Sequence, residues 1–110
     1  MKAEFQHQSL AAGRWGAFSL AEQLGNIGSE VNRAIRARGD EKRFDSAVSR
    51  GLELFDLTIS DIRWRKRLKE LTRARELFCD AVLGGTEYGT SLEDLDKYFY
   101  YFALAARAHR

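Results

Sequence analysis

The sequence predicts an all-α protein, a four-helix up-down bundle with an N-terminal arm. Four segments between Ser19 and Arg107 place apolar residues at helical spacing, and the chain contains no proline that would interrupt them. The connections between these segments are short, which favours antiparallel neighbours. We expect residues 1–18 to form the arm and residues 19–110 to form a single helical domain.

The composition is that of a globular protein, with 110 residues of which 45% are hydrophobic and 31% are charged. A chain of this length can bury a core without disulfides. No apolar run approaches the roughly 20 residues of a membrane span, and the N-terminus lacks the hydrophobic stretch of a signal peptide. The single cysteine, Cys79, fits a reducing compartment. We therefore expect a cytoplasmic location and no membrane contact.

The first two helices have clear start signals. Ser19 and Glu22, in S-L-A-E, are spaced as a capping box in which each side chain satisfies a backbone donor of the other. Gly39 is expected to end the first helix, and Asp40 is a favourable N-cap for the second.

The third and fourth helices are separated by Gly84-Gly85, a strong stop signal. Thr90 and Glu93, in T-S-L-E, predict a capping box for the fourth helix. The third helix is expected to start at Asp61, almost continuous with the second. If the chain does not turn there, the two helices merge and the core needs a second chain to close it.

Arg75 falls in the middle of the predicted inner stripe of the third helix, where an unpaired guanidinium is costly. It is therefore a candidate for a buried ion pair, with Glu30, Asp56 or Asp80 as its partner. The alternatives are an arginine that extends to solvent at the end of the bundle and an anion-binding site in the bundle.

Residues 63–75 carry seven basic residues and one acidic residue, a net charge of +6 in a chain of +2. Such a segment predicts contact with nucleic acid phosphates, and Trp64 could stack on bases. The alternative is a solvated helix face with Trp64 in the core. The candidate anion or nucleic-acid contacts are Arg63, Arg65, Lys66, Arg67, Lys69 and Arg73.

Several large apolar residues project away from the predicted inner faces. A helix that is apolar on all sides is usually buried on all sides, and tyrosine is typical of interfaces. These residues predict a contact with another chain, unless the arm covers them with Phe5 and Trp15. The candidate interface residues are Leu57, Leu77, Tyr100, Tyr101 and Leu104.

Residue patterns of catalytic, metal or cofactor sites are missing. The two histidines, His7 and His109, lie near the chain ends, and neither H-E-x-x-H nor a paired-cysteine metal site occurs. We therefore expect no catalytic residue, no metal and no cofactor, and the pattern favours a protein that is not an enzyme.

Four segments together resemble a family of small bacterial and archaeal all-helical proteins of unknown function. They are NIGSEVNRAI (26–35), SRGLELFDLTISD (49–61), RLKELTRARELFCD (67–80) and EYGTSLEDLDKYFYYFALAAR (87–107). The resemblance implies a stand-alone small protein and transfers no catalytic residue. This chain departs from the family at Ile62, where such sequences have proline, which weakens the predicted break between the second and third helices.

The sequence thus favours a helical protein–protein interaction module that acts as a homodimer. A nucleic-acid-binding accessory protein that uses the basic third helix is the alternative.

Overall fold

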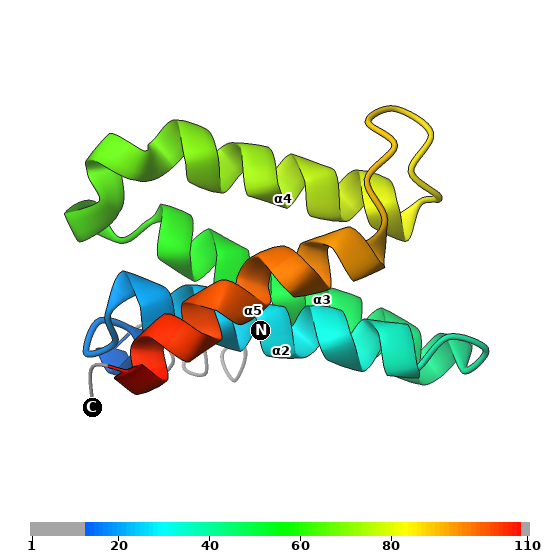
Figure 1. Ribbon diagram of the computed structural model, residues 1–110, viewed down its shortest axis with the longest axis horizontal. Coiled ribbons are helices and arrows are strands. Elements are labelled where there is room, and N and C mark those ends of the chain that lie inside the picture. Colours follow the sequence, from blue (N-terminus) through cyan, green and yellow to red (C-terminus); the bar gives the residue numbers. More distant parts are fainter. Residues whose placement is uncertain (1–12, 109–110) are drawn as a thin grey trace, which may run out of the picture.

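The computed structural model describes residues 13–108, and these residues form helices and turns without a strand. The predicted all-α class is confirmed. Figure 1 shows that successive α-helices run in opposite directions and that α4 lies to one side of the others. None of the described helices is both long enough and apolar enough to cross a membrane. The elements are α2 (Leu20–Arg36), α3 (Glu41–Ile59), the 3₁₀ helix η1 (Ile62–Arg67), α4 (Leu68–Val82) and α5 (Leu92–Ala108).

The starts of α2 and α3 agree with the predicted signals. Glu22 donates its backbone N–H to the Ser19 hydroxyl over 3.1 Å, and its carboxylate accepts the Ser19 N–H over 2.9 Å. The Asp40 carboxylate accepts the backbone N–H of Arg43 over 3.2 Å. Both caps satisfy donors that the first turn leaves without a helical partner.

The predicted capping box of α5 is wrong by one residue. Ser91, and not Thr90, exchanges hydrogen bonds with the side chain and backbone of Asp94, both over 3.1 Å. Glu93 instead forms an ion pair with Arg38. Both Thr90 and Ser91 are suitable caps by residue type, so residue type alone left the choice open.

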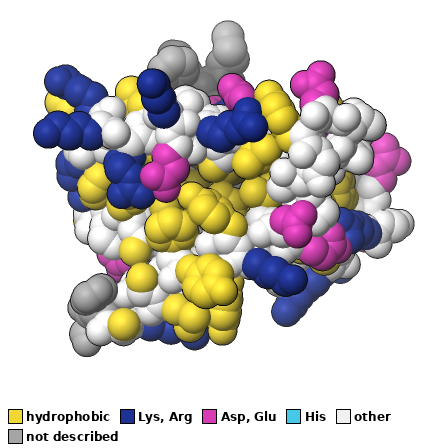
Figure 2. Space-filling view, turned by 45° about the horizontal axis from the view of Figure 1, so that its top comes forward, with side chains coloured by type: hydrophobic (Ala, Val, Ile, Leu, Met, Phe, Trp, Pro, Cys, Tyr) yellow, Lys and Arg dark blue, Asp and Glu magenta, His cyan; other side chains and the backbone are white. Residues whose placement is uncertain are grey.

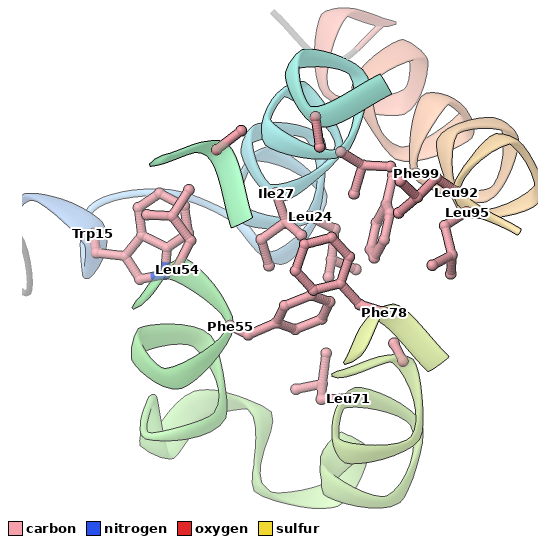
Figure 3. Packing of buried hydrophobic residues seen from close by; sticks show 14 residues of the cluster. Trp15, Leu24, Ile27, Leu54, Phe55, Leu71, Phe78, Leu92, Leu95 and Phe99 are labelled. Atoms are coloured by element: carbon pink, nitrogen blue, oxygen red, sulfur yellow. The ribbon is translucent and has the colours of Figure 1, made fainter. Parts of the chain in front are cut away.

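Three phenylalanines from different helices meet at the centre of the core (Figure 3). Phe55 of α3, Phe78 of α4 and Phe99 of α5 are completely buried. The ring of Phe55 lies 5.7 Å from that of Phe78 and 5.8 Å from that of Phe99. Burying aromatic rings contributes both apolar area and ring contacts, so this cluster links three of the helices.

α2 and α5 approach each other through glycine. A Cβ atom placed on Gly28 would lie 2.5 Å from Cβ of Phe99, and one on Gly25 would lie 3.2 Å from Cα of Ala103. The missing side chains allow this approach, as expected for glycines on a helix face. One side of α5 is therefore covered by α2 along much of its length.

The turn between α3 and η1 is held by a buried polar network centred on Gln23. The Gln23 amide donates to the carbonyl of Trp15 over 2.9 Å and to the Asp61 carboxylate over 3.1 Å. Its oxygen accepts the Trp64 indole N–H over 2.9 Å. Gln23 is completely buried, and each hydrogen bond removes part of the cost of burying its amide. The network joins α2 to segments far away in the sequence.

The third helix does not start at Asp61 as predicted. Asp61 instead caps η1 by accepting the backbone N–H of Arg63 over 3.1 Å, and the α-helix starts only at Leu68. Trp64 has φ −103° and ψ 21°, outside helical values. Helices two and three are thus separate, and the chain turns without the help of a proline.

Asp80 organises the turn between α4 and α5. Its buried carboxylate accepts the backbone N–H groups of Glu87 and Tyr88, each over 3.0 Å. Gly84 and Gly85 have φ values of 112° and 71°, which residues with a side chain rarely adopt. This turn fixes the position at which α5 begins.

We predict that Gly28→Ala destabilises the fold. Alanine is the better helix former by about 1 kcal/mol, but the added methyl group would collide with Phe99 and force α2 and α5 apart. Overpacking typically costs about 1–3 kcal/mol, so the free energy of unfolding, measured with urea, should decrease. Ser29→Ala, at the adjacent exposed position of α2, is the control and should be neutral or stabilising. Equal stabilities of the two variants would contradict the close contact.

We also predict a pH-dependent contribution from Asp61. The Arg63 guanidinium, followed by Gln23, lowers the pKa of this carboxyl from 3.8 to about 2. Its side chain is only 10% exposed. A lowered pKa stabilises the fold above the unfolded value and loses this effect as the pH falls towards the folded value. The shift corresponds to about 2 kcal/mol.

Asp61→Asn should therefore be less stable than the wild type at pH 6, with a gap that narrows as the pH falls from about 4 towards 2. Urea unfolding at several pH values measures this gap. Asp45→Asn is the control, because Asp45 is exposed on α3 and has no ion pair or side-chain hydrogen bond among residues 13–108. A gap for Asp61→Asn that does not change with pH would contradict the assigned role.

Candidate functional site

Three large side chains form what we call the outer face of α5: Tyr100, Tyr101 and Leu104. They are exposed by 56%, 71% and 41%, respectively. Single exposed apolar residues are ordinary on a protein surface, but a group of them on one helix face marks an interaction site. Figure 2 shows hydrophobic side chains gathered in the middle of the face that carries α4 and α5, with charged side chains of both signs around them.

A groove of about 320 Å³ lies next to this face, between α4 and α5. Ala74 and Leu77 of α4 form one wall, and Leu95 and Tyr98 of α5 form the other. The groove exists because α4 approaches α5 only thinly, in contrast to the close contact of α5 with α2. Its walls are apolar, so water in it is readily displaced by an apolar partner.

Polar residues surround the groove and position its tyrosine. The Tyr98 hydroxyl donates to the Glu70 carboxylate over 3.1 Å, while the Tyr98 ring packs edge-on against Phe99 and Phe102. Burial, followed by the charge of Glu70, raises the pKa of Tyr98. Arg67, followed by Tyr98, holds the pKa of Glu70 below its usual value, partly offset by burial. Tyr98 is therefore a neutral, fixed wall of the groove.

The five predicted interface residues do not form one surface. Tyr100, Tyr101 and Leu104 share the outer face of α5, and Leu77 lines the groove beside it. Leu57 is half-buried against the core and lines a separate cleft of about 580 Å³ on α3, together with Arg75. Tyr98, which is not among the predicted interface residues, also lines the groove.

The described part of the N-terminal arm packs away from the outer face of α5. Trp15 is 6% exposed, and its indole N–H donates to the Thr58 hydroxyl of α3 over 3.0 Å. Phe18 packs edge-on against Trp15, and Phe5 lies outside the described residues. Among residues 13–108, nothing covers the outer face of α5.

Arg75 forms an ion pair with Asp56, one of its three candidate partners, over 3.0 Å. The pair is not buried, because the side chains of Arg75 and Asp56 are 35% and 62% exposed. Glu30 lies 3.3 Å from Arg33 instead, and Asp80 caps the turn before α5. The predicted burial of Arg75 is wrong because the buried side of α4 is formed by Leu71, Ala74 and Phe78. Arg75 lies at the edge of that side, where it reaches solvent.

Half of the candidate nucleic-acid contacts are engaged within the chain. Arg63 pairs with Asp61 over 2.7 Å and lies over the Trp64 ring, Arg67 pairs with Glu70 over 2.9 Å, and Arg73 lies 3.8 Å from Glu76. Trp64 is half-buried and hydrogen-bonded to Gln23, so it packs as a core residue.

The other half is exposed. Arg65, Lys66 and Lys69 have no carboxylate within ion-pair distance in the part of the chain that the structure describes. Arg65 and Lys66 lie on η1 and Lys69 lies on α4. The basic segment therefore presents three unpaired cations among its six candidate contacts.

Polar residues in the described chain are used mainly for structure. Ser19 and Ser91 cap helices, and Thr58 bonds to Trp15 and to the carbonyl of Leu54. Residues 13–108 contain no cluster of three or more histidine, cysteine or acidic side chains that could hold a metal ion. His7 and His109 lie outside the described residues.

Comparisons of the chain with family models, with curated proteins and with solved structures find no match.

Proposed function

We propose that this protein is a non-enzymatic helical interaction module that associates with a second copy of itself through α5. The observation that carries the proposal is the exposure of Tyr100, Tyr101 and Leu104 on one helix face. In the proposed dimer these side chains are removed from water, which favours association.

The residue types support a protein partner. Tyrosine combines a large apolar ring with a polar end and has few rotatable bonds, so it loses little entropy when an interface orders it. Tyrosine is also among the residues that dominate measured interface energies. Tyr100 and Tyr101 place two such side chains at adjacent positions, with Leu104 one turn further along.

Three hydroxyl groups among the described residues support a role without catalysis. Activated nucleophiles need a base within hydrogen-bond reach, whereas Ser19, Ser91 and Thr58 are hydrogen-bonded to backbone groups and to an indole. The proposed cytoplasmic location follows from the single cysteine and the composition.

We predict that Tyr101→Glu combined with Leu104→Glu converts a dimer into a monomer. Each substitution would bury a charge in the interface, and the loss of such a side chain typically weakens binding by about tenfold or more. Size-exclusion chromatography with light scattering gives the mass of each variant.

The control is Tyr88→Glu, which also introduces a glutamate. Tyr88 lies on the turn before α5 and is 42% exposed. This variant should remain dimeric, and all proteins should keep the helical circular dichroism of the wild type. A wild type that is monomeric at every concentration would exclude self-association.

A nucleic-acid-binding accessory protein is the second candidate. The observation that favours it is the set of three exposed cations without carboxylate partners, Arg65, Lys66 and Lys69. If they bind three phosphates of duplex DNA, the logarithm of the binding constant should fall with the logarithm of the salt concentration with a slope of about −3.

Fluorescence anisotropy with a labelled duplex tests this prediction. Replacing Arg65, Lys66 and Lys69 by glutamine should abolish binding. Replacing the paired arginines Arg67 and Arg73 by glutamine removes two positive charges instead of three and should weaken binding much less. Binding that is independent of salt, or no binding by the wild type, would rule out the second candidate.

A further inference from the structure

A cleft of about 370 Å³ lies between the end of α2 and the start of α3, and we call it the arginine cleft. Arg33 and Arg36, one turn apart on α2, form one wall, and Arg43 in the first turn of α3 forms the other. Ala37, which is 7% exposed, and Ser46 complete the lining. The described residues that line the cleft thus include three cations and no carboxylate.

The turn between α2 and α3 brings these side chains together. α2 ends at Arg36 and α3 begins at Glu41. Between them, Gly39 has a φ of 93°, which residues with a side chain rarely adopt. Ala37 lies in the same turn and has only a methyl group to occupy the space between the helices. The cleft therefore follows from the tight turn and from a small residue within it.

The three guanidinium groups donate no hydrogen bond to residues 13–108. Arg36 has no carboxylate within ion-pair distance in this range. Arg33 lies 3.3 Å from Oε1 of Glu30, an oxygen that accepts no hydrogen bond. Arg43 lies 3.6 Å from the Asp40 carboxylate, which is beyond hydrogen-bond distance. Each guanidinium carries five N–H donors, so the cleft gathers strong donors that the described chain leaves unused.

The neighbouring carboxylates do not cancel the charge of the cleft. The Glu30 side chain is only 9% exposed, whereas that of Arg33 is 66% exposed and reaches solvent. Asp40 uses one carboxylate oxygen to cap α3. Even if both carboxylates are counted against the three arginines, one positive charge remains. The cleft therefore favours an anion.

Phosphate is the anion whose chemistry fits this arrangement best. A guanidinium binds phosphate through two parallel hydrogen bonds, and a phosphate monoester offers three strong acceptor oxygens where a carboxylate offers two. Three arginines can therefore share one phosphate group, and the Ser46 hydroxyl adds a further donor. A volume of about 370 Å³ also falls in the range of small-molecule sites, about 300–1,000 Å³.

We propose that the arginine cleft binds the phosphate groups of a small molecule through Arg33, Arg36 and Arg43. This site is separate from both functions proposed above. Figure 1 places the α2–α3 turn and η1 at opposite ends of the molecule, because the 19 residues of α3 span about 28 Å between them. The cleft also includes no residue of α5.

The experiment titrates the full chain with inorganic pyrophosphate in a calorimeter at low salt, because salt screens exposed charges. We expect saturable binding of one pyrophosphate per chain. Arg36→Gln should weaken this binding by about tenfold or more, since it removes charge-assisted hydrogen bonds. Arg36 is the arginine to change because its loss leaves no carboxylate without its partner. Helical circular dichroism confirms that the variant is folded.

Two further variants separate a built site from general attraction by charge. Arg65→Gln removes the same charge from another exposed arginine without a carboxylate partner among the described residues, and it should leave the affinity unchanged. Arg36→Lys keeps the charge but loses the planar fork of the guanidinium, so it should bind pyrophosphate more weakly than the wild type does.

Adenosine triphosphate, used in place of pyrophosphate, identifies the source of the phosphate. Tighter binding than that of pyrophosphate assigns the cleft to a phosphorylated organic molecule whose organic part contacts Ala37. Equal binding assigns it to a free inorganic phosphate compound. Both results require that Arg36→Gln weakens the binding.

Three results would overturn the proposal: no saturable binding by the wild type, equal weakening by Arg36→Gln and Arg65→Gln, or an Arg36→Lys variant that binds as tightly as the wild type. Displacement of pyrophosphate by duplex DNA would also overturn it, because the cleft would then serve a nucleic acid. None of these results depends on whether the chain forms a dimer, so this proposal and self-association fail separately.

Discussion

The buried side chain of Gln23 determines the path of the chain from α3 to α4. Its amide contacts three segments at once, the residues before α2, Asp61 at the end of α3, and Trp64 in η1. An amide buried without these partners would cost about 1–3 kcal/mol, so the three segments must meet for the core to form. The network thereby converts the end of α3 into a corner and sends α4 back along the other helices. It acts at the start of α4, and the Asp80 carboxylate fixes the turn at its other end.

The position of α4 between these two fixed ends explains why α5 has an uncovered side. Gly25 and Gly28 bring α2 very close to α5, and Phe99 therefore faces a filled core. α4 contributes Leu71, Ala74 and Phe78 to the same core but packs mainly over α3 and only thinly against α5. The result is a groove on one side of Tyr98 and exposed tyrosines beyond it. Both features follow from the geometry of the core, and neither requires a specialised insertion.

Local signals in the sequence were sufficient for most of the helix ends. These signals act through neighbours within a few residues, so the sequence alone identifies them. They are Ser19 with Glu22, Asp40, and Gly84-Gly85. The corner at Asp61 depends on Gln23, which is 38 positions earlier, and no local pattern reveals that partnership. The same holds for Arg75, because the side of α4 that is buried, with Leu71, Ala74 and Phe78, depends on how the other helices approach it.

The candidate surface was also predictable only in part. The exposed side of α5 was visible as apolar residues outside the inner stripe, because that stripe was assigned from local spacing. The groove was not visible, because its opposite wall, Ala74 and Leu77, belongs to a different helix. Leu57 shares the off-stripe pattern of Leu77 and yet lines a different cleft, so the pattern identifies exposed positions without grouping them into one site.

The distribution of charge separates the two proposed functions more clearly than the number of charges does. In the basic segment, Arg63 helps to hold the corner through Asp61 and the carbonyl of Phe18, and Arg67 fixes Glu70 beside Tyr98. These cations therefore serve the fold and the groove, and an approaching phosphate would have to compete with their carboxylates. On α5, in contrast, Tyr100, Tyr101 and Leu104 make the middle of the exposed side apolar. An exposed apolar surface of this kind suits a protein partner, whereas it offers a polyanion few contacts.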